Sequence, residues 1–206
     1  MIWPTYQDDE VAVFHPTFET LATDALRRLG IDGTYLWEHH PKSAGVGVVP
    51  DYVLIEKTTR RWILVVEIKR TEASVRSERN QIQAKGYAGA NASLFRVGCQ
   101  HFFAVTNLEL FHLYAPRGGM PPRDCLVEGQ VYDWGRLTDS DRAAYRERVT
   151  ADLAGIVRFS INERHPTFAV VWPVIVDAMF QHSRSLPFRP SMVTTTTIPS
   201  VVQDYF

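Results

Sequence analysis

Hydrophobic positions recur at helical spacing near the start of the chain, over residues 16–29. The apolar stripe consists of Leu21, Ala25, Leu26 and Leu29. Pro16 suits the first turn of a helix and Gly30 suits its end, so the pattern predicts a helix between them. A more polar helical pattern covers residues 74–90, and a third helical pattern begins at residue 138.

Short runs of β-branched and aromatic residues occupy the middle of the chain. The predicted strands cover residues 33–39, 51–57, 62–69, 102–106, 110–114 and 130–134. Polar residues 58–61 separate the second run from the third, which predicts a hairpin. Because residues 62–66 are apolar without interruption, we expect the third strand to be covered on both faces.

The order of these elements predicts an α/β fold with a mixed central sheet flanked by helices. Residues 1–135 are expected to form this core. Residues 136–206 are expected to form a mainly helical C-terminal extension of unknown role, interrupted by several prolines.

Composition excludes a disordered or collagen-like chain, because 45% of the 206 residues are hydrophobic and 22% are charged. The formal net charge is −1, so a polyanionic partner has to meet a local basic surface. Such a surface is predicted between Lys57 and Tyr87, where eight cationic side chains oppose three anionic ones. This local excess of positive charge suits DNA, although a solvated helix rich in charges gives the same pattern.

Two cysteines are too few for a disulfide framework, and they lack metal-ligand spacing. The acidic N-terminus does not resemble a signal peptide, and the longest apolar run is too short to cross a membrane. We therefore expect a cytoplasmic protein with no membrane partner. His39 and His40 lack the spacing of a zinc protease motif and are interpreted as strand and loop residues.

Three ionisable residues carry the candidate chemistry: Asp51, Glu67 and Lys69. Glu67 and Lys69 leave the same face of one predicted strand, because they are two residues apart. Asp51 lies beside Glu67 if the hairpin pairs residues whose numbers sum to 118, which requires an odd-length loop or a bulge. A sum of 119 sends Asp51 to the other face, and the sequence leaves both registers open.

Two neighbouring carboxylates suit Mg²⁺, which prefers oxygen ligands. Mg²⁺ polarises a phosphodiester and lowers the pKa of water, and a lysine beside it stabilises developing negative charge. This chemistry needs no nucleophilic side chain.

Pro50-Asp51, fifteen intervening residues, and Glu67-Ile68-Lys69 together resemble the PD-(D/E)xK nuclease superfamily, which includes many restriction endonucleases. Gln83 and Tyr87, on the next predicted helix, match the Gln-x-x-x-Tyr pattern of a subset of these nucleases. Residues 103–107 followed by 110–114 are similar to the nuclease modules of type I and related restriction enzymes. The resemblance covers residues 15–115. It implies a restriction endonuclease-like core.

The resemblance also implies roles for individual residues. Asp51 and Glu67 are expected to be metal ligands, with the Ile68 carbonyl as a further ligand and Glu19 as an additional acidic group. Lys69 is expected to be the catalytic lysine, and Gln83 and Tyr87 to position the site. The implied activity is Mg²⁺-dependent DNA cleavage in a restriction or other defence system, with Mn²⁺ as a substitute metal. A homodimer or a larger restriction complex is the expected assembly.

Other interpretations stay open at this stage. Asp51 is also consistent with a turn, Glu67 and Lys69 with an ion pair at a strand edge, and Glu19 with a solvated helix face. Gln83 and Tyr87 also fit an ordinary helix packed on a sheet. The chain is then either a catalytically inactive nuclease fold that binds nucleic acid or assembles complexes, or an unrelated α/β protein that binds a partner through residues 187–206.

Overall fold

Six strands form one mixed sheet in which every strand lies beside its neighbours in the sequence. The strands are β1 (Tyr35–His39), β2 (Tyr52–Glu56), β3 (Trp62–Ile68), β4 (Phe102–Thr106), β5 (Leu110–Tyr114) and β6 (Leu126–Asp133). Only the β3–β4 pair is parallel among the strands in the described part of the chain. The mixed sheet is therefore confirmed, and β6 begins four residues before the predicted 130–134 strand.

This computed structural model describes residues 4–5, 7–41, 49–116, 119–135, 141–163 and Val176. The chain divides into two compact units, Met1–Glu163 and Arg164–Phe206. The sheet and all the named helices belong to the first unit. Apart from Val176, the second unit lies outside the described residues, as do residues 187–206, which were considered as a partner-binding tail.

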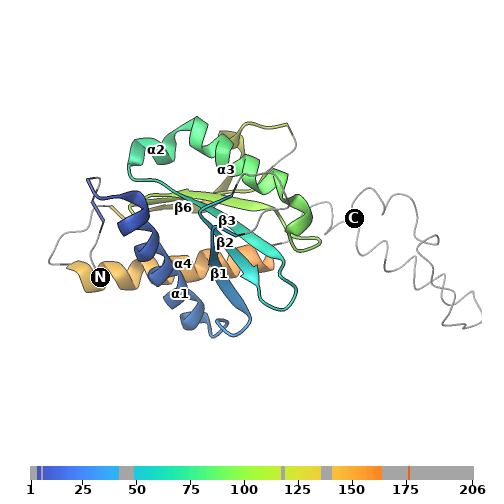
Figure 1. Ribbon diagram of the computed structural model, residues 1–206, viewed down its shortest axis with the longest axis horizontal. Helices are drawn as coiled ribbons and strands as arrows, with labels where there is room; N and C mark the ends of the chain where they lie inside the picture. The colour runs from blue at the N-terminus through green and yellow to red at the C-terminus, as the bar shows by residue number, and fades with distance from the viewer. Residues whose placement is uncertain are drawn as a thin grey trace, which may run out of the picture. The chain divides into compact units, whose positions relative to one another are not determined.

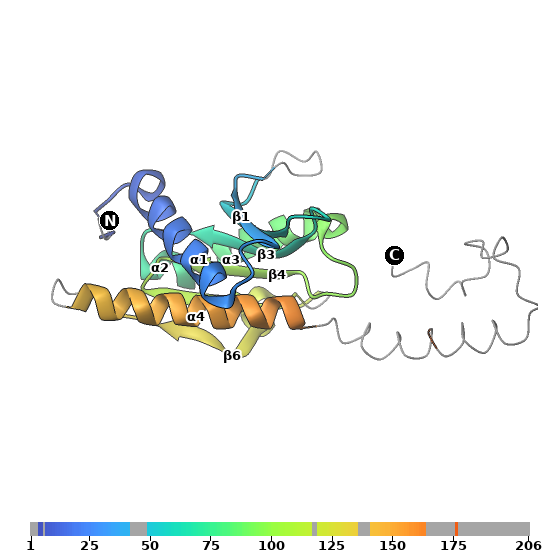
Figure 2. The same ribbon diagram turned by 90° about the horizontal axis from the view of Figure 1, so that it is seen from below.

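Helices cover both faces of the sheet (Figure 1). One face packs against α1 (His15–Leu29) and α4 (Arg142–Asn162), and the other packs against α2 (Glu72–Arg76) and α3 (Glu78–Ala90). Figure 2 shows α4 running along its face of the sheet. Every residue of β3 is buried, as its uninterrupted apolar sequence predicted.

The segment before α1 is a short π-helical stretch, η1 (Glu10–Phe14), that continues directly into α1. The Asp9 carboxylate caps it by accepting hydrogen bonds from the backbone N–H groups of Val11 and Ala12. At the other end of α1, Gly30 adopts a left-handed φ of 67°, which confirms the predicted helix stop. Two 3₁₀ turns complete the elements: η2 (Ala92–Leu94) and η3 (Pro122–Cys125).

Helix α4 shares its hydrophobic core with α1 and the sheet. Its buried apolar side chains are Tyr145, Val149, Leu153, Ala154, Ile156 and Val157. Since the first compact unit extends to Glu163, the boundary expected after residue 135 falls inside that unit. No helix in the described part of the chain has both the length and the hydropathy needed to cross a membrane.

Candidate functional site

The register of the β2–β3 hairpin determines which side chains meet at its open end. Tyr52 pairs with Val66 and Leu54 with Leu64, and an irregularity after Leu54 then pairs Ile55 with Trp62. The paired numbers next to the site sum to 118, and the shift supplies the bulge that this register requires. Continued by one residue, the register sets Asp51 beside Glu67.

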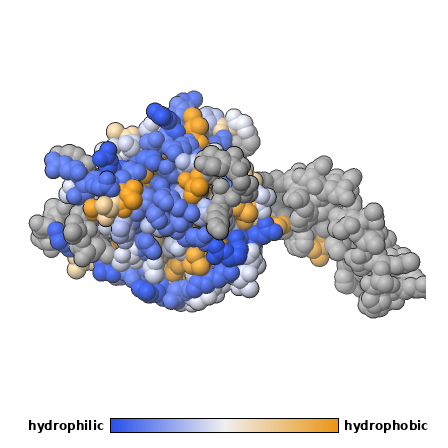
Figure 3. All heavy atoms as spheres, in the orientation of Figure 1, coloured by the Kyte–Doolittle hydropathy of each residue, from blue (hydrophilic) through white to orange (hydrophobic). Residues whose placement is uncertain are grey.

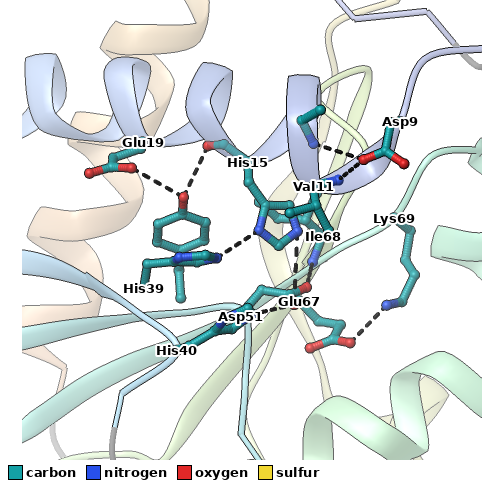
Figure 4. Close-up of polar contacts among 12 residues, drawn as sticks. Asp9, Val11, His15, Glu19, His39, His40, Asp51, Glu67, Ile68 and Lys69 are labelled. Atoms are coloured by element: carbon teal, nitrogen blue, oxygen red, sulfur yellow. Dashed lines mark hydrogen bonds and ion pairs between the residues drawn. The ribbon is translucent and has the colours of Figure 1, made fainter.

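Asp51 is fixed at the end of the sheet by contacts from two directions. Its Oδ2 atom accepts a hydrogen bond of 2.7 Å from the backbone N–H of Ile68. Its Oδ1 atom lies 3.9 Å from His15 Nε2 and 3.8 Å from His40 Nε2 (Figure 4). One carboxylate oxygen is therefore committed to the backbone of β3, while the other faces a group of imidazoles.

Glu67 is the most confined carboxylate of the site, with only 3% of the residue exposed. Its Oε1 atom accepts a hydrogen bond of 2.7 Å from Lys69 Nζ. Its Oε2 atom is buried and has no hydrogen-bond partner among the described residues. Burial, reinforced by the nearby Asp51 charge, raises the pKa of Glu67 to about 7.

Lys69 projects from the end of β3 toward Glu67 (Figure 4). Burial alone favours a lower pKa for Lys69, but the charge and hydrogen bond of Glu67 outweigh it, and Asp51 and Glu10 act in the same direction. The net pKa of Lys69 is raised, so the amine carries its positive charge at neutral pH.

Gln83 and Tyr87 are joined on α3, the helix that covers the Glu67 face of the sheet. Gln83 Nε2 donates a hydrogen bond of 2.5 Å to the Tyr87 hydroxyl. Tyr87 is buried, and burial raises its pKa, with Glu67 and Asp51 contributing to the same shift. The Tyr87 hydroxyl is thus within electrostatic reach of both carboxylates.

Glu10, and not Glu19, belongs to the group of candidate ligand atoms that includes Asp51. Glu19 accepts a hydrogen bond of 3.3 Å from the Tyr52 hydroxyl, and Figure 4 shows it on the side of His39 away from Lys69. Glu10, in η1, instead groups with His15 and Asp51, with candidate ligand atoms within 4.8 Å of one another. Burial raises the pKa of Glu10, while Lys69 opposes that rise.

Sequence reasoning missed the histidines at this site. His15 is buried at the start of α1, and its Nδ1 atom lies 3.0 Å from Nε2 of His39, the last residue of β1. His40 follows in a left-handed conformation, φ 44°, and its backbone N–H donates to the Asp51 carbonyl. Burial lowers the pKa of both His15 and His39, favouring their neutral forms. The only signal was the His39-His40 pair at a strand end.

The donor set fits a hard divalent cation. The buried Glu67 Oε2, which no described residue contacts through a hydrogen bond, is costly to bury unless a cation or proton satisfies it. Asp51 and the partly buried Glu10 offer further oxygen donors, which group with a His15 nitrogen within 4.8 Å of one another. Such oxygen-rich, incompletely satisfied sites suit Mg²⁺, which retains several waters.

Exposed cations continue from the site along the chain. Arg70 follows Lys69 directly, and Arg76 and Arg79 lie on α2 and α3. Arg76 pairs with Glu72 at 2.8 Å, an exposed pair that leaves both side chains in contact with solvent. Figure 3 shows hydrophilic residues over most of the face presented by α1 and α2.

A family model described as the BpuSI N-terminal domain matches residues 4–163, which is nearly the whole first compact unit. The chain belongs to the BpuSI N-terminal domain family. The chain also matches the crystal structure of the type IIG restriction endonuclease BpuSI, with a TM-score of 0.72 and 27% sequence identity. This match covers 85% of the present chain and 20% of the BpuSI chain, so the present chain spans about a fifth of that enzyme's length. No curated protein matches the chain. The first unit is thus a restriction-enzyme-related domain.

Proposed function

We propose that this domain is a Mg²⁺-dependent DNA endonuclease of the PD-(D/E)xK type that acts in a restriction system. The observation that carries the proposal is the meeting of Asp51, Glu67 and Lys69 at the end of the β2–β3 hairpin, where Glu67 Oε2 has no hydrogen-bond partner in the part of the chain that the structure describes. Membership of a family named for part of a restriction endonuclease supports the same function.

Asp51 and Glu67 would hold the metal, with the Ile68 carbonyl as a further ligand and Mn²⁺ as a substitute ion. When bound, Mg²⁺ polarises the phosphodiester and lowers the pKa of water. Lys69 stabilises the negative charge that builds on the phosphate in the transition state, because its ammonium group is positively charged. Its hydrogen bond of 2.7 Å to Glu67 keeps that charge beside the proposed metal ligand. Gln83 and Tyr87, which are joined by a hydrogen bond on α3, help to position the site from the face of the sheet that carries Glu67.

DNA is the proposed partner, because the basic stretch from Lys57 to Tyr87 includes the site and can neutralise phosphates. No target-reading motif accompanies the site in the sequence. We therefore propose that sequence specificity comes from a homodimer or from a larger restriction complex.

The proposal predicts metal-dependent cleavage that disappears when single site residues are changed. Lys69→Met retains the aliphatic length but removes the charge, and we expect cleavage to fall by about 10²–10³-fold. Asp51→Asn is expected to abolish Mg²⁺-supported cleavage. The measurement is plasmid cleavage by the purified chain with Mg²⁺, Mn²⁺ or EDTA, with folding checked by circular dichroism.

Arg123→Met is the matched control, since Arg123 is an exposed cation in η3, outside the basic stretch from Lys57 to Tyr87. It should cleave at the unmodified rate. If Lys69→Met also retains that rate, the assignment is wrong. If the chain binds DNA without cleaving it, and binding does not need metal, the domain is an inactive nuclease fold used for binding or assembly.

A further inference from the structure

Three imidazoles converge beside Asp51 without a role in the proposed cleavage. His15 begins α1, His39 ends β1 and His40 is the next residue in the chain (Figure 4). One ring nitrogen from each lies within 4.8 Å of the other two. Since two elements distant in sequence are needed to assemble this group, the fold itself creates it.

We propose that His15, His39 and His40 form a binding site for a divalent transition-metal ion, with Zn²⁺ as the ion that fits best. The ligands of this site differ from those proposed for Mg²⁺, and the two sites share Asp51 as a neighbour. Imidazole nitrogens suit zinc and its neighbours in the first transition row, whereas Mg²⁺ takes oxygen ligands. Three protein ligands leave a fourth tetrahedral position for water.

The spacing of the first two ligands agrees with this ion. His15 Nδ1 and His39 Nε2 lie 3.0 Å apart. In a tetrahedral site with Zn–N bonds of about 2.0–2.1 Å, ligand nitrogens are separated by about 3.3–3.4 Å. An ion between these two nitrogens therefore requires them to separate only slightly. His40 is stacked on His39 with ring centroids 3.8 Å apart, so its ring has to turn out of this stack to supply the third nitrogen.

The surroundings of His15 already favour the tautomer that a metal needs. His15 Nε2 is buried, has no hydrogen-bond partner among the described residues and faces Asp51 Oδ1 at 3.9 Å. A proton on Nε2 is favoured there, because a bare nitrogen lone pair would face a carboxylate oxygen. His15 Nδ1 then presents its lone pair toward His39.

This arrangement makes Asp51 an outer-shell partner of the proposed ion. Metal-bound histidines commonly donate their second N–H to a carboxylate, which fixes the ring and strengthens the ligand. The opposite carboxylate oxygen of Asp51 remains bonded to Ile68 N. Because His39 and His40 are exposed while His15 is buried, an ion can enter from the solvent side.

The test is titration of the full, untagged, EDTA-treated chain with Zn²⁺ by isothermal calorimetry. We expect one zinc site. His39→Ala and His40→Ala should each weaken it at least tenfold, and Asp51→Asn by about 10–100-fold. Co²⁺ in place of Zn²⁺ should give the intense visible absorption of a tetrahedral centre, and that absorption should vanish in His39→Ala.

Two controls isolate the site. His101→Ala removes a histidine elsewhere in the fold, and Glu67→Gln removes the central carboxylate of the proposed Mg²⁺ site; both should retain zinc affinity. The proposal fails if the chain binds no zinc, or if binding survives the double change of His39 and His40 to alanine. Because the readout is zinc binding, its outcome is independent of whether the domain cleaves DNA.

Discussion

At the scale of single residues, the site is organised around Glu67, whose burial raises its pKa and so disfavours its ionised form. Glu67 is buried and binds Lys69 through one oxygen, while the other oxygen has no hydrogen-bond partner among the residues that the structure describes. A nearby cation satisfies that oxygen without the need for a proton. The free domain and the metal-bound domain should therefore differ in the protonation of this one group.

This difference predicts that Mg²⁺ binding depends on pH. The pKa of Glu67 is about 7, so the side chain is mostly protonated at pH 6 and mostly ionised at pH 8. Only the ionised form is a ligand, so we expect Mg²⁺ affinity to be about tenfold weaker at pH 6 than at pH 8, with proton release on binding. Calorimetry in two buffers of different ionisation enthalpy measures both quantities.

A matched variant separates Glu67 from the imidazoles. His40→Gln removes the exposed ring that faces Asp51 at 3.8 Å but leaves Glu67 and Lys69 intact. The pH dependence should persist in this variant. Equal Mg²⁺ affinity at pH 6 and pH 8 in the unmodified chain would contradict the assignment.

Much of the candidate site could be predicted from the sequence, because its three central residues lie on one hairpin. The alternation of strand side chains relates Glu67 to Lys69 directly. The histidines and Glu10 could not be predicted in the same way. They come from η1, α1 and the end of β1, and only packing across the molecule brings them to Asp51.

At the scale of elements, the β2–β3 hairpin carries the geometry of the site. The loop length was compatible with two registers, and the irregularity after Leu54 selects the one that brings Asp51 to Glu67. A bulge of this kind leaves no clear mark in an apolar run such as Trp62 to Val66. The register therefore had to come from the structure.

The hairpin loop contains a strained residue whose replacement should stabilise the domain. Arg60 has a φ of 58°, in the left-handed region that costs a non-glycine residue about 1–2 kcal/mol. Its exposed ion pair with Glu38 is worth about 0–1 kcal/mol. We expect Arg60→Gly to raise the free energy of unfolding by about 1 kcal/mol, as measured by urea denaturation.

The neighbouring position provides the comparison. Arg61 has no positive φ, and its guanidinium donates to the Ser93 carbonyl, so Arg61→Gly should lower the free energy of unfolding. If both glycine variants are destabilised equally, the loop strain inferred at Arg60 is absent.

The helix predicted over 74–90 is in fact two helices, because Ser77 is extended between α2 and α3. Serine is tolerated inside helices as well as favoured at their N-caps, so its residue type alone does not settle whether the helix breaks at Ser77. The change of direction allows Val75 on α2 and Ala84 on α3 to enter the same core against the sheet.

At the scale of the whole molecule, α4 closes one face of the sheet. The sequence predicted a helix there but assigned it to a separate extension, because its moderate periodicity gives no sign of what it packs against. In the structure its buried face joins the core formed by α1 and the sheet. Exposed ion pairs also link the two helices, Arg28 with Glu147 and Arg146 with Asp24.

The packing of α4 against α1 and the sheet predicts where the chain can be truncated without loss of folding. A fragment of residues 1–163 should fold, whereas a fragment of residues 1–135 should lack cooperative unfolding because it exposes the face that α4 covers. Leu153 is buried, so Leu153→Ala is expected to lower the free energy of unfolding by about 2–5 kcal/mol. Thermal unfolding followed by circular dichroism distinguishes the two fragments. Cooperative unfolding of the 1–135 fragment would show that α4 is dispensable.

The position of α4 at the end of this unit also affects how the domain is made. Each strand lies beside the previous one in sequence, so the sheet can assemble progressively as the chain leaves the ribosome. The part of the sheet and of α1 that α4 covers, however, stays exposed until residue 163 emerges, an interval on the order of seconds at cellular rates of synthesis. The nascent domain thus passes through a defined period in which a large apolar face is open to chaperones or to aggregation.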